Sequence, residues 1–430
     1  MLKELLSFRS SEFKKNVAVV FTGSVASQLI SVLTAPIIAR IYSPENYGIF
    51  GLFLSIASIV AVLATLRYTQ AILVSKTDED AQRIMQFCLR SVFAVSGLIL
   101  IVIAVGYDYV IRILSADDLG RYIFLLPFAT FFTGLTEVYT TWLNRFKGYR
   151  ALSTGRVMVS AVTVVVYLLW AIFYSATFVG LLVGMIIAQL VGALYLFLRS
   201  MKYNNRAVSF DWSKTVPLLS FHKKFPLYSL PTDLITVFTN QLPVFMLSRF
   251  AGSSEVGYFN MSQRLLSLPS TFISGAVGEV FKQRATEDFF KTGTCRPIFI
   301  KTFKALAATG IVPFALILFF GPWMFSAFLG AKWEMAGVYS RIFALMFFLR
   351  FINSPLSYIL YIVNKQQYDI IAVIAFNIAS LAAFWFGFQY FSTTTVIALY
   401  AGVCVLNYIA MLILNYKLSS HLNSEMEIAA

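Results

Sequence analysis

The chain has 430 residues, of which 59% are hydrophobic and only 13% are charged, and its formal net charge at pH 7 is +14. Soluble domains do not have such a composition, and continuous apolar runs of about 18 residues or more are typical of membrane-spanning helices. The runs do not alternate with polar residues, which argues against strands. The basic charge fits cytoplasmic loops of a membrane protein better than a nucleic-acid-binding surface.

The chain begins with a basic segment, residues 1–15, whose apolar residues suggest a short helix at the membrane surface. The apolar run that follows is too long for the core of a signal peptide and has no clear cleavage site, so we expect a retained first span. The hydropathy pattern predicts twelve spans in all: 17–39, 48–75, 88–106, 119–141, 157–174, 178–198, 226–248, 256–281, 298–320, 339–363, 369–391 and 394–416. The eighth, 256–281, is markedly polar, and a soluble amphipathic helix is its alternative interpretation.

The sequence predicts two six-helix lobes, residues 1–198 and 226–430, joined by a basic cytoplasmic linker at 199–225. Two junctions support a duplication. Arg40, Gly48 and Phe50 of the first junction map without a gap onto the same residue types of the second, which are Arg249, Gly257 and Phe259. Internal repeats are common among membrane transporters. The alternative interpretation of the linker is a solvated basic connector that lies against anionic lipid headgroups.

Lys and Arg concentrate in alternate loops. With the N terminus inside, few basic residues fall outside, namely Arg40, Arg112, Arg121, Arg249, Lys332 and Arg341. This asymmetry follows the positive-inside rule, so we expect both Met1 and Ala430 in the cytoplasm.

Charged side chains within spans are functional candidates, because a charge at mid-membrane costs at least about 2.5–3.5 kcal/mol. Arg264 shares a predicted helical face with four polar residues, Asn260, Ser267, Thr271 and Ser274. Counted from Asn260, Arg264 and the three later residues stand at offsets of four, seven, eleven and fourteen. Arg350 lies near the centre of its span, close to Pro355. Arg67 lies toward the cytoplasmic end of its span. Arg264 and Arg350 could each line a cavity or make polar contacts between helices. Arg67 could line a cavity, or its side chain could extend to the membrane surface.

The first helix of each predicted lobe carries a polar stripe. In the first lobe it contains Gln28, and in the second it contains Asp233 and Asn240. Asp233 and Glu137 are the acids nearest the hydrocarbon, so each could pair with an Arg, carry a coupling ion such as H+ or Na+, or lie at the membrane surface. A guanidinium binds phosphate with two parallel hydrogen bonds and stays charged, which favours an anionic substrate. We therefore expect Arg67, Arg264, Arg350, Gln28, Asn240 and Asn260 to bind substrate.

Nothing in the sequence predicts catalysis, a metal site or a cofactor. The cysteines Cys88, Cys295 and Cys404 are scattered, and the two histidines, His222 and His421, lie far apart. No Ser or Cys has a His placed to activate it. We therefore interpret the chain as a protein without enzymatic activity.

The residues Gly23–Ile30 and Ala39–Gly48 together resemble the polysaccharide transporter family, and the likeness continues through Leu66–Ile72 and Lys76–Ala81, which is similar to its O-antigen and oligosaccharide flippase branch. The resemblance implies a two-lobed, V-shaped, all-α bundle around a central cavity, like that of multidrug exporters of the same superfamily. It also implies a substrate, an undecaprenyl-pyrophosphate-linked oligosaccharide, turned from the inner to the outer leaflet of the bacterial inner membrane. Relatives often carry an acid after the Arg-Tyr pair, whereas Thr69 stands here, so any balancing acid must come from elsewhere.

We therefore expect a flippase for lipid-linked O-antigen or other surface polysaccharide units, working by alternating access among membrane lipids, with a polysaccharide polymerase and a chain-length regulator as further partners. A multidrug exporter of the same fold would favour acidic pocket residues, which are scarce. A membrane polymerase or glycosyltransferase would need a sizeable external loop with acids or His, and the outer loops are short. A membrane scaffold without transport activity remains a further alternative.

Overall fold

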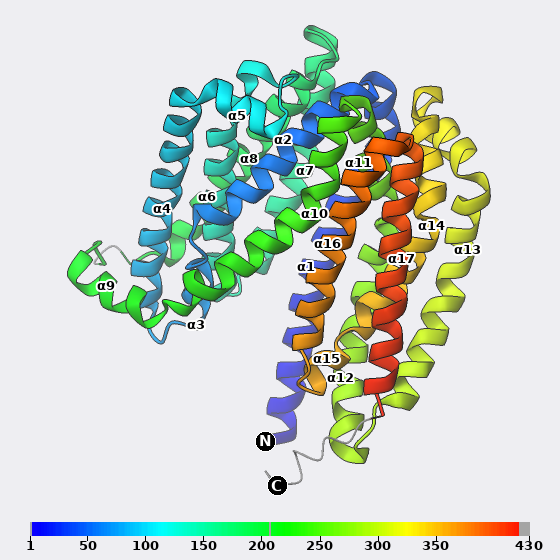
Figure 1. Cartoon of the computed structure of the whole chain (residues 1–430). Helices are drawn as coiled ribbons and strands as arrows, with labels where there is room; N and C mark the ends of the chain where they lie inside the picture. The colour runs from blue at the N-terminus through cyan, green and yellow to red at the C-terminus, as the bar shows by residue number, and fades with distance from the viewer. Residues whose placement is uncertain (1, 206–207, 421–430) are drawn as a thin grey trace. The chain divides into compact units, whose positions relative to one another are not determined.

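The computed structural model describes residues 2–205 and 208–420, and this part of the chain is helical with turns and no strand. The predicted all-α architecture is confirmed (Figure 1). The contacts divide the chain into two units, Met1–Arg249 and Phe250–Ala430. The predictions for His421, Met1 and Ala430 concern positions outside the described residues.

The first unit is built from long helices with short connecting turns. Its elements are α1 (Leu2–Ile41), α2 (Pro44–Ala64), α3 (Thr69–Val74), α4 (Asp78–Val105), α5 (Tyr107–Leu114), η1 (Gly120–Leu125), α6 (Leu126–Arg145), α7 (Tyr149–Phe173), α8 (Phe178–Ser200), η2 (Met201–Tyr203), α9 (Trp212–Phe221), η3 (Phe225–Ser229) and α10 (Leu230–Phe250), whose last residue belongs to the second unit.

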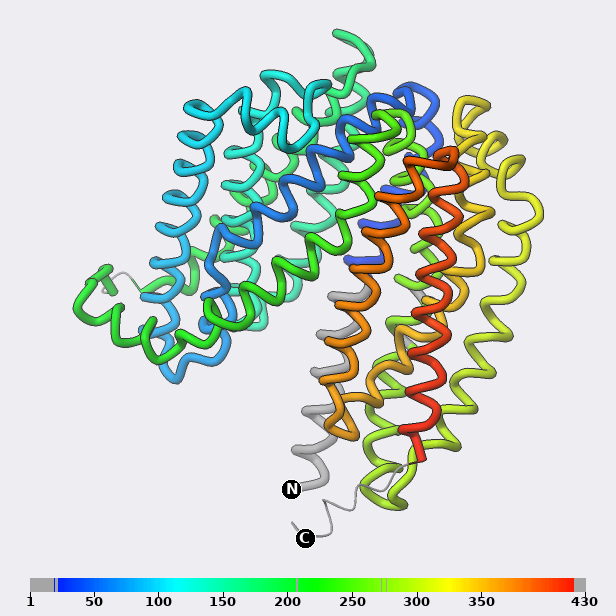
Figure 2. Tube along the Cα trace, in the orientation of Figure 1, coloured from blue at the N-terminus to red at the C-terminus, as the bar shows by residue number. Residues whose placement is uncertain are grey.

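The second unit repeats this style of construction, as the tube in Figure 2 makes easy to follow from residue 250 to residue 420. Its elements are α11 (Ser253–Leu266), η4 (Ser270–Ser274), α12 (Gly275–Thr292), α13 (Arg296–Leu329), η5 (Ala331–Trp333), α14 (Glu334–Leu356), α15 (Ile359–Ile362), α16 (Gln367–Tyr390) and α17 (Thr393–Leu418).

Ten helical segments in the described part are long and apolar enough to cross a membrane. They are Thr22–Ile41, Pro44–Ala64, Asp78–Val105, Gly120–Arg145, Tyr149–Phe173, Phe178–Tyr203, Arg296–Leu329, Ala331–Ile362, Gln367–Tyr390 and Thr393–Leu418. The two remaining predicted spans, 226–248 and 256–281, correspond to α10 and to α11 through α12, and do not meet this criterion. Polar side chains recur in both segments and lower their hydropathy. The same polar side chains make these segments candidate sites.

The predicted continuous span 48–75 is wrong, because the helix breaks after Ala64. Leu66 and Arg67 both adopt left-handed backbone conformations, with φ of 49° and 60°. Such a conformation costs a non-glycine residue about 1–2 kcal/mol. Ser91 of α4 donates a 3.0 Å hydrogen bond to the Ala64 carbonyl, one of those left without a helical partner at the break. The chain then resumes as α3.

The predicted continuous helix 256–281 is also wrong. A π-helical turn, η4, separates α11 from α12 just after Pro269, whose ring cannot donate a backbone hydrogen bond. A π-turn holds more residues than an α-turn, so it rotates the residues after it relative to those before it. Ser274 accordingly packs against α14, where it donates a 2.9 Å hydrogen bond to the Phe351 carbonyl. The five-residue polar face expected around Arg264 is therefore not continuous.

Small residues and aromatic rings account for the close packing within each unit. In the first unit, a Cβ on Gly180 or Gly184 of α8 would lie 2.4 or 2.5 Å from the rings of Trp170 and Tyr167 on α7. Small residues of this kind let membrane helices approach closely. In the second unit, α14 carries a fully buried aromatic stripe at four-residue spacing, consisting of Tyr339, Phe343, Phe347 and Phe351.

The segment after α8 docks onto α4 of the same unit. Gln82 exchanges two 2.9 Å hydrogen bonds with the backbone of Asn205, and the Arg90 guanidinium lies 3.6 Å from the centre of the Phe210 ring. Asp211 caps the N terminus of α9, and hydrogen bonds from Ser213 hold the pKa of this carboxyl below its usual value. The basic segment is thus an ordered part of the first unit where the structure describes it.

Candidate functional site

An ionic cluster gathers three of the predicted site residues in the first unit. Arg67 Nε lies 2.5 Å from Asp233 Oδ2, and Arg67 Nη1 lies 3.6 Å from Glu137 Oε1. The three side chains are between 22% and 35% exposed, so the cluster is half-buried and still reachable from solvent. One guanidinium therefore contacts two carboxylates, contributed by α6 and α10.

The broken helix explains how Arg67 reaches both acids. The residue lies in the left-handed turn between α2 and α3, which directs its side chain differently from that of a residue within a continuous helix. Arg145 fixes the other end of α3, because its Nη1 donates to the carbonyls of Ile72 at 2.7 Å and Ser75 at 3.0 Å. Backbone strain at a position that orients a charged group is a common property of functional sites.

Thr69 takes part in the same cluster. Its hydroxyl donates a 2.9 Å hydrogen bond to Glu137 Oε1, the oxygen that also lies near Arg67. Thr69 follows the Arg67-Tyr68 pair, where the family resemblance implies an acid. In this chain, the negative charge near Arg67 comes from Glu137 and Asp233, and Thr69 orients the first of them.

Further along α10, polar residues lie next to α2. Gln241 Oε1 accepts a 2.7 Å hydrogen bond from the Ser55 hydroxyl, and the two helices run beside each other (Figure 1). Asn240, two turns from Asp233, is exposed and has no hydrogen-bond partner within the described residues. Gln28 on α1 is half-buried and likewise lacks a partner in that part of the chain, whereas its neighbour Ser24 contacts Arg156 of α7 at 2.5 Å.

Arg350 occupies a different environment in the second unit. Its guanidinium carbon lies 5.6 Å from the centre of the Phe347 ring, a cation–π distance. It also acts electrostatically on Tyr400, Cys404 and Tyr408 of α17. The side chain is exposed and has no carboxylate partner in the part that the structure describes. This proximity to α17 could not be predicted from the sequence, because α17 begins more than 40 residues after Arg350.

Arg264 and Asn260 lie one turn apart on α11. Arg264 is exposed and Asn260 half-buried, and neither side chain has an ionic or hydrogen-bond partner among residues 2–205 and 208–420. The structure therefore unites Arg67, Glu137 and Asp233 in one cluster, and leaves Arg264 and Arg350 as cations available to a ligand.

Solved structures with a similar fold are transporters. A structure described as the lipid II flippase MurJ, in an inward closed conformation, matches with a TM-score of 0.74 at 13% identity, over 93% of this chain and 87% of that one. An inward-facing multidrug resistance MATE family transporter of the MOP superfamily matches with a TM-score of 0.68 at 16% identity, over 94% of each chain. Identities this low show the fold alone.

The apolar helices define a multi-pass membrane protein, and its fold is the one seen in these two solved structures. The family model described as polysaccharide biosynthesis protein matches residues 13–281, and the chain belongs to that family. The succinoglycan biosynthesis transport protein ExoT of Rhizobium meliloti (strain 1021) is 23% identical over 255 residues. That match covers 58% of this chain and 48% of ExoT, so the chain spans about half the length of this relative.

Proposed function

We propose that this protein carries an undecaprenyl-pyrophosphate-linked oligosaccharide, an O-antigen or another surface polysaccharide unit, across the bacterial inner membrane by alternating access. The family supports a polysaccharide-related cargo. The observation that carries the proposal is the pair of cations, Arg264 and Arg350, which are exposed and have no carboxylate partner within the described residues. A cation in a membrane needs water or an anion beside it, and a pyrophosphate supplies the anion.

The chemistry of Arg350 fits this role. The Phe347 ring lies beside the cation, and Tyr400 and Tyr408 of α17 lie within its electrostatic range. A sugar presents the matching surfaces, because it has hydroxyls at its edge and an apolar face. Asn260, Asn240 and Gln28 would add neutral hydrogen bonds without altering the charge balance. A transporter of cationic drugs would instead need carboxylates where Arg264 and Arg350 stand.

The acids of the first unit have a separate role in this proposal. Asp233 and Glu137 share the one charge of Arg67, so the cluster has more negative than positive groups. Two neighbouring carboxylates favour uptake of a cation by one of them. We assign to this pair the exchange of a coupling ion, either H+ or Na+. The translocated unit would then pass to a polymerase and a chain-length regulator.

The experiment compares charge with shape at the two free arginines. Arg264→Gln and Arg350→Gln should each abolish surface polysaccharide per molecule of inserted protein, and the Lys variants should restore part of it, since Lys keeps the charge but loses the planar fork. Arg341→Gln is the matched control, because Arg341 is an exposed arginine on α14, the helix that carries Arg350. Normal export per molecule in both Gln variants would refute the assignment of head-group binding.

A further inference from the structure

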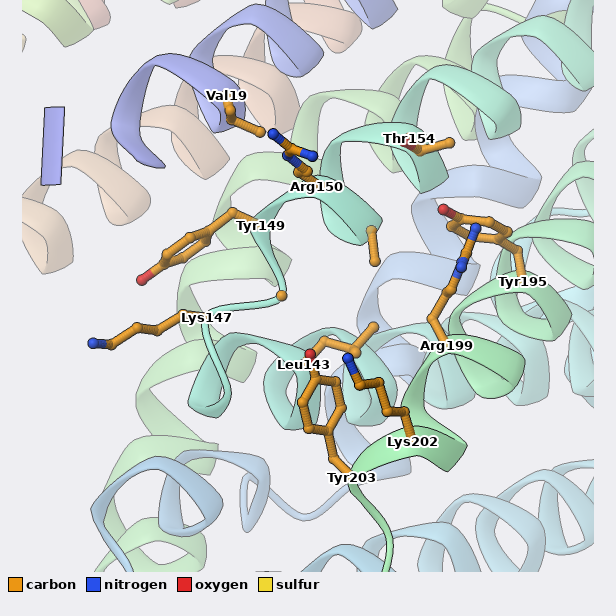
Figure 3. A pocket seen from close by; sticks show the side chains of 12 residues that line it. Val19, Leu143, Lys147, Tyr149, Arg150, Thr154, Tyr195, Arg199, Lys202 and Tyr203 are labelled. Carbon is orange, nitrogen blue, oxygen red and sulfur yellow. The ribbon is translucent and has the colours of Figure 1, made fainter. Parts of the chain in front are cut away.

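A basic pocket lies in the first unit and shares no lining residue with the ionic cluster. It has a volume of about 510 Å³ and is formed where α6 ends, α7 begins and α8 passes into η2, with Val19 of α1 on one side. Figure 3 shows Arg150, Arg199 and Lys202 on different sides of the opening, whereas Lys147 extends outward. We call this site the α6–α8 pocket.

The lining of the α6–α8 pocket is strongly cationic. It contains those four basic side chains and no carboxylate. All four are exposed, and none forms an ion pair within the described chain. The first turn of α7 also lines the pocket and has no side-chain cap, so the positive end of the helix dipole adds positive potential there. This combination is suited to a ligand with more than one negative charge.

The pocket adjoins a surface that suits lipid chains. Tyr195, Arg199 and Lys202 line it at intervals of four and three residues along the end of α8 and η2. Each follows directly after an exposed apolar residue, and these three neighbours form a stripe beside the pocket: Leu194 (53% exposed), Leu198 (57%) and Met201 (50%). Tyr195 also contacts Arg199 at 5.3 Å between ring centre and guanidinium. Tyrosines and basic residues at helix ends are typical of the headgroup layer.

We propose that the α6–α8 pocket binds the phosphates of an anionic phospholipid of the inner leaflet, with the acyl chains along the Leu194–Met201 stripe. The lining cations recognise phosphate, which a soluble polyphosphate would also offer. The apolar stripe favours the lipid, because only a lipid has chains to cover it. Basic pockets between membrane helices on the cytoplasmic side are a common form of lipid site. The pocket shares no residue with the proposed head-group site at Arg264 and Arg350, and it does not depend on which cargo is carried.

The test titrates the purified full-length protein, in a neutral detergent, with cardiolipin, phosphatidylcholine or inorganic pyrophosphate, and counts bound molecules by native mass spectrometry. Cardiolipin should bind more tightly than phosphatidylcholine. The triple variant Arg150→Gln, Arg199→Gln, Lys202→Gln should bind cardiolipin about a hundredfold more weakly, since each basic residue contributes about a factor of five. Replacement of the same three residues by the other basic type, Arg by Lys and Lys by Arg, should retain most of the binding.

The matched control removes three charges elsewhere in the same unit. Lys214, Lys223 and Lys224 are exposed and lie outside the pocket, so their Gln variants should bind cardiolipin like the wild type. Equal losses in both triple variants would mean that total charge, and no defined site, attracts the lipid, and would overturn the proposal. Pyrophosphate bound as tightly as cardiolipin would equally overturn it, by showing a site for soluble anions.

Discussion

Arg67 Nε lies 2.5 Å from Asp233 Oδ2, which ties the break between α2 and α3 to α10. The contact joins an interrupted helical segment to the polar helix α10, and Glu137 of α6 adds a second acid at 3.6 Å. A rigid helix at residues 65–68 could not present the guanidinium in this way. The strained left-handed turn therefore positions Arg67 for its ion pairs with the two acids.

A double-mutant cycle should detect this pairing. Arg67→Gln and Asp233→Asn should each lower the melting temperature, and the double variant should lose less than the sum, with a coupling energy of about 1 kcal/mol for partly exposed partners. The charge-reversed pair Arg67→Asp with Asp233→Arg should recover part of the loss. Arg112→Gln serves as a control for removing an arginine outside the cluster. Strict additivity would show that the pair does not stabilise the protein.

The same acids should set the ion dependence of transport. Glu137→Gln and Asp233→Asn each remove one negative charge from beside Arg67, so we expect export to become insensitive to a collapsed proton or sodium gradient and to fall at least tenfold. Thr69→Val should have a smaller effect, because it only removes the hydroxyl that orients Glu137. Gradient-driven export that persists at the wild-type level in both acid variants would exclude these residues as the coupling site.

The two junctions should stabilise their units in parallel ways. Asn46 Oδ1 accepts a 2.7 Å hydrogen bond from the Phe178 N–H at the start of α8. Glu255, which likewise stands two residues before the glycine of its junction, accepts from the Tyr339 hydroxyl, which in turn bonds Thr394 at the start of α17. Each junction is thus linked to the first turn of a later helix of its own unit, directly to α8 in the first unit and through Tyr339 to α17 in the second.

Asn46→Ala should therefore destabilise the protein by about 1–2 kcal/mol, since it removes the acceptor of an unpaired helix N–H. Asn46→Asp keeps that acceptor and should cost less. Glu45→Ala, at an exposed neighbour on the same turn, is the control. Thermal unfolding in detergent measures the effect, and equal melting temperatures for Asn46→Ala and Glu45→Ala would contradict it.

The charge asymmetry predicts which loops face the cytoplasm. A cysteine at exposed Lys214 should resist a membrane-impermeant maleimide added to intact cells whose outer membrane has been permeabilised, whereas one at exposed Ser175 should react. The background is low, because Cys88, Cys295 and Cys404 are all buried. Modification at Lys214 with protection at Ser175 would reverse the predicted orientation.

Hydropathy was sufficient to predict the helical class and most spans, because an apolar run of this length has few other solutions. It could not predict the break at Leu66 and Arg67, since no Gly or Pro marks it and tertiary ion pairs hold it. Arg67, Glu137 and Asp233 could be chosen as candidates from their positions in or near the predicted spans. Their convergence could not be predicted, because the turn after α2 and the helices α6 and α10 are far apart in the sequence. The α6–α8 pocket was missed because its basic residues count, in the sequence, as ordinary inner-loop charges.

The most direct test of the central claim is translocation by the purified protein in proteoliposomes loaded with undecaprenyl-pyrophosphate-linked oligosaccharide. The fraction of oligosaccharide accessible to an external glycosidase should exchange with the protected fraction over time in wild-type vesicles. Arg350→Gln vesicles should exchange at least tenfold more slowly, and Arg341→Gln vesicles at the wild-type rate. Exchange no faster than in protein-free vesicles, with folded wild-type protein present under an imposed proton or sodium gradient, would contradict the claim that this chain is the flippase.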